Sequence, residues 1–285
     1  MAARLASGPA RIIGAGTRRW GRDVHAPALE TAALKGWDHE PGDFTVVIGA
    51  GERVSEIGAR LAEHGQMLAL DPPGNGTVGG LVATADSGPM RHRYGAPRDL
   101  VIGVQMALAD GTVARGGGRV IKNVAGYDLP KLAAGSYGTL GVITEVAVRL
   151  HPRPEAWATA VLRFDAPEAL QAAALELSRR PLEADALDLR WDGGRGSLLV
   201  RFAGSAAAER AAKVAGEVIE DDEDVWAQQR ARQRGDFVVR VHALPTEIAR
   251  VLRAVPRATA VGRAGVGTIW LRVPSDTDPA RLRGL

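Results

Sequence analysis

The chain has 285 residues, of which 46% are hydrophobic, and 36 basic residues are set against 33 acidic ones. This composition is typical of a globular protein of one or two domains, and no long basic run with interleaved aromatics favours nucleic-acid binding. Cysteine is absent, which excludes disulfides, cysteine-ligated iron–sulfur clusters and thioether-linked cofactors. No apolar stretch has the length of a membrane span or of a secretory signal, so we expect a cytoplasmic protein.

The first half of the chain predicts short strands and helices separated by glycine. A buried strand at Thr45–Ile48, a helix at Val54–His64 and a strand at Gln66–Leu70 would form a βαβ-like unit. Further on, Ala-Asp-Gly joins the apolar runs Leu100–Leu108 and Thr112–Ala114, which predicts a β-hairpin.

A short helix and a boundary follow. Asp128 is a predicted N-cap for a helix at Leu129–Ala134, and Gly135 is its predicted left-handed stop. The β-branched run 141–149 then predicts a strand. Two prolines within residues 151–155 cannot continue a sheet ladder, so we expect domains at residues 1–155 and 156–285.

The second half alternates strands and helices in an α+β pattern. The expected strands lie at Ala156–Phe164, Ala186–Trp191, Ser197–Phe202, Asp236–His242, Thr259–Val261 and Gly267–Val273. The expected helices lie at Pro167–Arg179, Ser205–Val218, Thr246–Ala254 and in a segment that ends near Arg234. This order favours an antiparallel sheet built from split βαβ units.

Three glycine-rich segments stand out, at Gly14–Gly21, at residues 72–88 and at Gly135–Gly141. Successive N–H groups in such loops form concavities that bind anions, and Gly79-Gly80 leads into a predicted helix start. The segments therefore suit a ligand that carries a diphosphate. The alternative is that the glycines only mark turns, where glycine is common.

A partial dinucleotide fingerprint is also present. The run Phe44–Gly51 is a strand that ends in Gly-Ala-Gly, with Asp71 about twenty residues further on. Val54 stands where a small residue should let the helix pack on the strand, so we do not expect a nicotinamide site.

Two longer runs resemble a known family. Residues 72–103, which begin PPGNGTVGGLVATADSG, and residues 120–155, which begin VIKNVAGYDLPKLAAGSYGTLG, resemble the FAD-binding subunits of bacterial glycolate oxidases. More broadly, they are similar to flavoproteins of the vanillyl-alcohol-oxidase type. The resemblance covers most of residues 11–155, and residues 156–273 resemble the cap region of those subunits more loosely. It implies an α+β chain in which a two-subdomain FAD-binding domain of that type precedes an antiparallel-sheet cap domain.

The resemblance also implies which residues would hold FAD, all of them through backbone or small side chains. They are Gly14, Ala15, Gly16, Thr17, Pro73, Gly74, Thr77, Val78, Gly79, Gly80, Ala83, Thr84, Ser87, Gly88, Gly141, Val142 and Ile143. Relatives that tether the flavin through the first loop use histidine where Thr17 stands, so the resemblance implies non-covalent FAD. Many relatives carry asparagine at the position of Ala85, and the FxP…NPG segment of the family is not found before Leu285. We therefore expect a shortened member, or a site that a partner completes.

Candidates for chemistry are few. His92 and Tyr94 are candidates for the base that takes the hydroxyl proton, although a solvated basic turn is the simpler interpretation. The six histidines, at positions 25, 39, 64, 92, 151 and 242, share no ligand spacing, so no metal site is expected. Lys122, Asn123 and Tyr127 form a polar cluster with Asp128, for which the helix cap is sufficient explanation.

Four predicted strands each carry an arginine between apolar neighbours, namely Arg190, Arg201, Arg240 and Arg272. If these strands share a sheet, the arginines could line one face. The simpler interpretation is the solvated face of a half-buried sheet, and the alternative is a face that binds an anion or an acidic partner.

The leading hypothesis is an FAD-binding subunit of a glycolate oxidase complex, which handles the electrons from glycolate beside a catalytic flavoprotein subunit and an iron–sulfur subunit. Such a subunit would be cytoplasmic, or held at a membrane by its partners. Two alternatives stay open: a stand-alone FAD oxidoreductase for another small 2-hydroxy acid, and a structural subunit with a degenerate flavin site.

Overall fold

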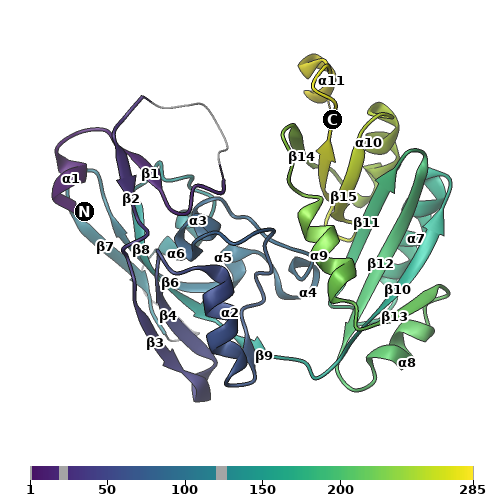
Figure 1. Cartoon of the computed structure of the whole chain (residues 1–285), viewed down its shortest axis with the longest axis horizontal. Coiled ribbons are helices and arrows are strands. Elements are labelled where there is room, and N and C mark those ends of the chain that lie inside the picture. The colour runs from purple at the N-terminus through teal and green to yellow at the C-terminus, as the bar shows by residue number, and fades with distance from the viewer. Residues whose placement is uncertain (1, 19–24, 120–126, 285) are drawn as a thin grey trace. The chain divides into compact units, whose positions relative to one another are not determined.

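The computed structural model describes residues 2–18, 25–119 and 127–284, and the chain divides into two compact units (Figure 1). The N-terminal unit comprises Met1–Ser87 and Tyr94–Arg153, and the C-terminal unit comprises Gly88–Arg93 and Pro154–Leu285. The short segment 88–93 thus belongs with the second unit. The domain boundary at residue 155 stays a prediction.

The N-terminal unit is built on a five-stranded antiparallel sheet with the strand order β3-β4-β8-β6-β7. These strands are β3 (Trp37–Glu40), β4 (Thr45–Gly49), β6 (Val101–Ala107), β7 (Val113–Gly117) and β8 (Val142–Arg149). Alternating apolar residues of the central strands, such as Val46, Ile48 and Val146, are buried in its core. The core is closed by helix α2 (Val54–Ala62), through Ile57 and Leu61, and by helix α3 (Val78–Ala83).

The other elements of this unit are short. They are α1 (Ala2–Ala6), β1 (Arg11–Ile13), β2 (Ala28–Glu30), η1 (Pro41–Asp43), β5 (Gln66–Met67), α4 (Arg91–Tyr94, mostly in the C-terminal unit), α5 (Pro97–Leu100), α6 (Leu129–Ala133) and β9 (His151–Pro152). Strands β1 and β2 pair in parallel. The predicted hairpin is confirmed as β6 and β7.

The predicted βαβ-like unit is wrong. Strand β5 has two residues and pairs antiparallel with β9, in a different sheet from β4. The apolar run after β5 is buried but irregular, and it leads into Pro72-Pro73, which cannot donate to a sheet ladder.

The C-terminal unit is a seven-stranded antiparallel sheet with the order β13-β10-β12-β11-β15-β16-β14. Its strands are β10 (Trp157–Phe164), β11 (Ala186–Asp192), β12 (Arg195–Ala203), β13 (Glu217–Glu220), β14 (Val238–His242), β15 (Thr259–Arg263) and β16 (Thr268–Arg272). Strand β12 lies between β10 and β11, so the expected split βαβ arrangement is confirmed.

The two faces of this sheet are covered differently (Figure 1). The helical elements of the unit are α7 (Pro167–Arg179), α8 (Ala207–Ala212), α9 (Glu223–Ala231), η2 (Pro245–Glu247), α10 (Ile248–Ala254) and α11 (Pro279–Leu282). Leu198 and Val200 of β12 face the large apolar core with α7, α8 and α10, whereas Leu199, between them, faces Trp226 of α9. The alternation of side chains along each strand therefore separates an apolar face from the face that α9 covers.

The predicted helix Ser205–Val218 is wrong in its second half. Helix α8 ends at Ala212, and β13 pairs with β10 at the edge of the sheet. Gly216 lets the chain approach β10 closely, because an added Cβ there would lie 2.7 Å from the Val161 carbonyl oxygen. A four-residue edge strand leaves too short a pattern to be recognised.

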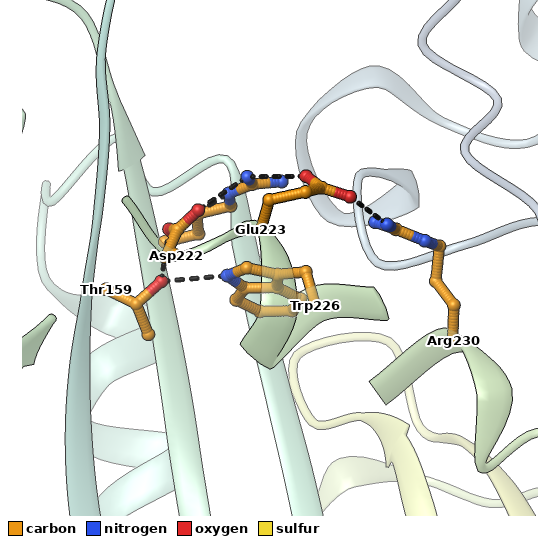
Figure 2. A network of polar contacts seen from close by, with 6 residues as sticks. Thr159, Asp222, Glu223, Trp226 and Arg230 are labelled. Atoms are coloured by element: carbon orange, nitrogen blue, oxygen red, sulfur yellow. Dashed lines mark hydrogen bonds and ion pairs between the residues drawn. The ribbon is translucent and has the colours of Figure 1, made fainter. Parts of the chain in front are cut away.

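A polar network anchors α9 on its face of the sheet (Figure 2). Arg201 donates from Nη2 to Oδ1 of Asp222 at 2.6 Å and from Nε to Oδ2 at 3.1 Å. Thr159 donates to the same carboxylate at 2.6 Å and accepts from the indole N–H of Trp226 at 2.8 Å. The Arg201 guanidinium also lies 4.0 Å from the ring centroid of Trp157. The side chains of Arg201 and Asp222 are 4% and 0% exposed, and the largely exposed Glu223 lies 3.4 Å from the same guanidinium.

We predict that Asp222→Ala lowers the free energy of unfolding by about 3–5 kcal/mol, because it leaves the buried Arg201 guanidinium with only the largely exposed Glu223 as its counter-charge. Urea unfolding followed by tryptophan fluorescence measures the change. The matched control is Asp276→Ala, which breaks an ion pair with Arg257 whose side chains are 73% and 64% exposed; it should cost less than about 1 kcal/mol. Equal losses in the two variants would contradict the prediction.

Candidate functional site

The helix α3 is held at its start by side-chain and backbone acceptors. Its N-cap, Thr77, accepts from the amide of Gly80 through Oγ1 at 3.3 Å, and its carbonyl accepts from Leu81 at 2.9 Å. The amides of Val78 and Gly79 donate to the carbonyls of Glu52 and Ala50, both at 2.9 Å. The N-terminal amides of α3 are therefore already used within the fold.

Two glycine-rich loops are fitted to the ends of α3. The loop that follows β1 passes Thr77 so closely that an added Cβ on Gly14 would overlap Thr77 Oγ1. The loop between α6 and β8 lies at the other end, where Gly135 and Tyr137 donate their amides to the carbonyls of Val82 (3.0 Å) and Ala83 (2.8 Å). Segments far apart in the sequence thus meet around one short helix.

These segments enclose a cavity of about 730 Å³ within the N-terminal unit. Eleven of the seventeen residues that the resemblance implied for FAD line it: Gly14, Ala15, Gly16, Thr17, Thr77, Gly79, Gly80, Ala83, Thr84, Gly141 and Ile143. A cavity of this size lies within the range of roughly 300–1,000 Å³ that small-molecule and cofactor sites occupy. The structure therefore brings the three segments together.

The remaining six residues do not line this cavity. Val78 belongs to the core, Pro73, Gly74, Ser87 and Val142 lie outside the lining, and Gly88 is part of the C-terminal unit.

The first loop offers donors that an anion could use. No described residue accepts a hydrogen bond from the backbone N–H groups of residues 14–17. These four residues line the cavity, and Gly16 has a φ of +66°. Consecutive N–H groups next to a residue in the left-handed region form an anion-binding concavity. Main-chain donors that an anion could use therefore lie in the first loop rather than at the start of α3.

An arginine in the lining was not predicted from the sequence. Arg18 donates from Nε to Asp86 at 2.8 Å, and the two side chains are 5% and 0% exposed. An added Cβ on Gly76 would overlap the Arg18 guanidinium, so this guanidinium lies directly against the Gly76 backbone. The position of Arg18, directly after Gly-Ala-Gly-Thr, is the signal that could have identified it.

The candidates around residue 128 separate into three groups. Lys122 and Asn123 lie outside the described residues. Tyr127 is 91% exposed. Asp128 accepts from the amide of Lys131 at 3.2 Å and caps α6, and Gly135 has a φ of +82°, so both predicted helix ends are confirmed.

His92 and Tyr94 belong to different units. The Tyr94 ring lies 4.6 Å from that of His151 in the N-terminal unit. His92 is partly buried in α4 and lines a second cavity, in the C-terminal unit, and burial lowers its pKa. A solvated basic turn is therefore the wrong interpretation for His92. Within the described parts of the chain, no three histidine, aspartate or glutamate side chains gather as a metal site.

The four sheet arginines share one face, as their alternation with apolar neighbours suggested. The register connects Arg190 through Val261 and Trp270 to Arg240, and Arg272 lies two residues after Trp270.

The face that carries these arginines is not a solvated one. Arg201 is bound in the α9 network and is unavailable to an anion, and Arg190 donates to Gln229 of α9 at 3.2 Å. The other two arginines are more accessible to solvent: Arg240 is half-buried and Arg272 is exposed.

The same face holds a fully buried ion pair that the sequence did not reveal. Arg263 donates from Nη1 to Asp188 at 2.6 Å and from Nε to the Gly88 carbonyl at 2.9 Å. Gln229 donates to the same carboxylate at 3.0 Å. Burial raises the pKa of Asp188 to about 6, although Arg263 and Gln229 favour its charged form.

The glycines of the partial dinucleotide fingerprint serve backbone packing. Gly49 and Gly51 donate their amides to the carbonyls of Gly36 (2.9 Å) and Leu34 (2.8 Å). An added Cβ on Gly49 would lie 2.6 Å from the Gly36 nitrogen, so the close approach of two chain segments requires glycine there.

Comparison with known proteins agrees with this cavity. Residues 2–117 match the family model described as FAD binding domain. The chain is 37% identical over 188 residues to the glycolate oxidase subunit GlcE of Escherichia coli, covering 62% of this chain and 54% of that protein. It is 32% identical over 206 residues to a D-lactate dehydrogenase of Archaeoglobus fulgidus, covering 66% and 46%. The chain thus spans about half the length of these curated relatives.

Solved structures show the same fold. Alkyldihydroxyacetonephosphate synthase superposes with a TM-score of 0.73 at 14% identity, over 96% of this chain and 65% of that one.

A shorter stretch, 31% of this chain, is 44% identical to the glycolate oxidase subunit GlcD of Bacillus subtilis and covers 19% of it. Among the described residues, no helix has the length and apolar character needed to cross a membrane.

The chain has an α+β fold with an antiparallel second unit, and residues 2–117, which match an FAD binding domain, contribute most of the glycine-lined cavity. The match to an FAD binding domain indicates FAD as the cofactor, and the relatives named above are glycolate oxidase subunits and a D-lactate dehydrogenase.

We predict that Ala85→Asn stabilises the protein by about 1 kcal/mol. Ala85 has a φ of +47°, and an alanine in the left-handed region costs roughly 1–2 kcal/mol, which asparagine partly recovers by local hydrogen bonding. Thermal unfolding measures the gain. Ala85→Val should lower stability, because β-branched residues avoid this region. A loss of stability in the asparagine variant would contradict the idea that the backbone of Ala85 is strained.

We predict that His92 makes the protein less stable in mild acid. Its folded pKa lies below the unfolded value of about 6.5, so the unfolded chain takes up a proton first as the pH falls. The stability contributed by the neutral imidazole is present above about pH 6.5 and is lost as the pH falls through the folded pKa. Urea midpoints between about pH 7.5 and about pH 5 should therefore fall less in His92→Gln than in the wild type. His64→Gln, at an exposed site, is the control, and identical slopes in wild type and His92→Gln would contradict the prediction.

Proposed function

We propose that this chain is the FAD-binding subunit of a complex that oxidises a small 2-hydroxy acid, with glycolate as the first candidate. The observation that carries the proposal is that residues 14–17, whose amides donate to no described residue, line a cavity together with α3 and the loop 135–141. The likeness to GlcE and to the D-lactate dehydrogenase supports the substrate class.

The cavity fits FAD in its donor set. The amides of residues 14–17 would hold the diphosphate, and Arg18, whose charge is paired with that of Asp86, lies in the same lining. Residues 77–84 and 141–143 would meet the rest of the cofactor through small side chains and backbone. The absence of cysteine, and a threonine at position 17, support non-covalent binding.

When bound, FAD supplies an acceptor for the hydride of the hydroxyl-bearing carbon. This chain's own residues would bind and orient the cofactor. Oxidation also needs a cation for the substrate carboxylate and a base for the hydroxyl proton. His92 and Tyr94 stay candidates for that base.

The proposed partners are a catalytic flavoprotein subunit and an iron–sulfur subunit. A chain without cysteine cannot hold a cysteine-ligated cluster, so electrons that leave its flavin need another carrier. We place residues 156–285 in this subunit as the cap domain, and the complex in the cytoplasm, with any membrane contact made by the partners.

A second candidate is an oxidoreductase that acts alone on D-lactate, favoured by the 206-residue match to a D-lactate dehydrogenase. A structural subunit with a degenerate flavin site is the remaining alternative.

The test is to purify the chain alone and with its co-purifying partners, and to record flavin absorption before and after glycolate or D-lactate. We expect bound flavin in the chain alone, and bleaching by glycolate only with the partners. Bleaching of the isolated chain by D-lactate would favour the second candidate. A colourless chain that does not take up added FAD would support a structural subunit and refute the proposal.

We predict that Gly14→Val weakens FAD binding at least about tenfold, a cost of about 1.4 kcal/mol. Its side chain would push the first loop away from Thr77 and so separate the diphosphate donors from α3. Quenching of FAD fluorescence measures the affinity, and circular dichroism checks the fold. Gly42→Ala is the control, because Gly42 is exposed and an added Cβ there meets nothing within 4 Å. Unchanged affinity in a folded Gly14→Val variant would count against the site.

A further inference from the structure

The second cavity lies wholly in the C-terminal unit and has a volume of about 410 Å³. Its base is apolar and includes Leu177, Leu187 and Val200, which are at most 5% exposed and belong to the core under α7. Its rim is polar and carries His92 and Arg180. A cavity with an apolar base and a few polar groups at its mouth is the usual form of a small-molecule site.

One wall of the cavity is held in a strained conformation. Glu183 has a φ of +51°, a region that residues other than glycine seldom adopt. Its carbonyl oxygen accepts from Arg93 Nη1 at 2.8 Å and from Arg210 Nη2 at 2.6 Å. Such strain persists only where neighbouring groups fix the backbone, and it is found most often at ligand sites.

The His92 side of the cavity is equally fixed. An added Cβ on Gly265 would lie 2.9 Å from His92 Cε1, so the imidazole packs directly against that backbone. The segment that carries His92 begins at Gly88, whose carbonyl is bound by the fully buried Arg263, itself paired with Asp188. The imidazole is therefore positioned by the core of the unit.

The charges at the mouth favour an anion. Arg93 and Arg180 supply two guanidinium groups, against the single carboxylate of Glu183 in the lining. Asp185, 3.5 Å from Arg93 Nε, balances this excess, but Arg210, 4.0 Å from the Glu183 carboxylate, adds a third guanidinium and leaves a net positive charge. Arg180 is exposed, and among the described residues its guanidinium makes one long hydrogen bond, 3.4 Å to the Lys213 carbonyl, so it has further donors to offer.

We propose that this cavity binds a short-chain monocarboxylate, with the carboxylate between Arg180 and His92 and the alkyl chain on the leucine base. A neutral imidazole keeps one N–H that can donate to a carboxylate, and a guanidinium adds charge-assisted hydrogen bonds. An alkyl chain would gain mainly by removing its own surface from water and by contact with Leu177, Leu187 and Val200, which are themselves already buried. This site lies in the C-terminal unit and does not depend on FAD being bound in the other one.

The test uses the full chain with its flavin and hexanoate as the probe, with binding measured by calorimetry and the His92 ring signals followed by NMR. We expect saturable binding, a rise in the His92 pKa on saturation, and at least about fivefold weaker binding in Arg180→Gln. The matched control is Arg179→Gln, at the exposed neighbouring position outside the lining, and it should stay within about twofold of the wild type. Hexanol and hexylamine should bind at least about tenfold more weakly than hexanoate.

Three results would overturn the inference. They are a dissociation constant above about 10 mM in the wild type, equal weakening in the Arg179 and Arg180 variants, and binding that leaves the His92 signals unmoved. The His92 NMR signals of the wild-type protein test the inference even if a variant fails to fold. Flavin absorption in the same samples reports separately on the proposed function, so the failure of one is distinguishable from the failure of the other.

Discussion

The N-terminal unit depends on the placement of one six-residue helix. Helix α3 is too short to be stable alone, and its amides and carbonyls are held by the turn that follows β4, by its own cap and by the loop after α6. The same contacts fix two glycine-rich loops, one against Thr77 and the other against the carbonyls of Val82 and Ala83. Because the cavity is the space between these pieces, its shape is a property of how α3 is anchored.

The C-terminal unit distributes its stability differently. One face of its sheet is an apolar core beneath three helices, whereas the other carries paired charges that are almost completely buried. Buried ion pairs contribute little net stability, but each is costly to break. The two buried ion pairs therefore fix positions rather than add much stability. The pair Arg201–Asp222 fixes where α9 lies, and the pair Arg263–Asp188 fixes the segment at Gly88. The apolar face provides most of the favourable free energy of folding.

Much of this fold follows from local sequence patterns. Helix α7 was predicted with its exact bounds, Pro167–Arg179, because proline, helix-forming residues and an apolar stripe agree there. Strands β5 and β13 were misjudged because two to four residues carry too little periodicity. The shared face of the four arginines followed from the alternation along strands, but their burial did not, since it depends on α9, which no pattern within a strand can place. The pairing of Arg18 with Asp86 joins positions 68 residues apart, and a single sequence does not reveal such contacts.

The chain passes between its two units at residues 87–88, 93–94 and 153–154, rather than once. Neither unit is consequently a contiguous piece of the gene. A recombinant fragment that stops at Arg153 would keep the hexapeptide 88–93 but lose Arg263, whose guanidinium binds the first carbonyl of that hexapeptide. The complementary fragment from Pro154 onward would lack the histidine that packs against Gly265. Half-length expression, a common shortcut for two-part enzymes, would therefore damage both parts of this one.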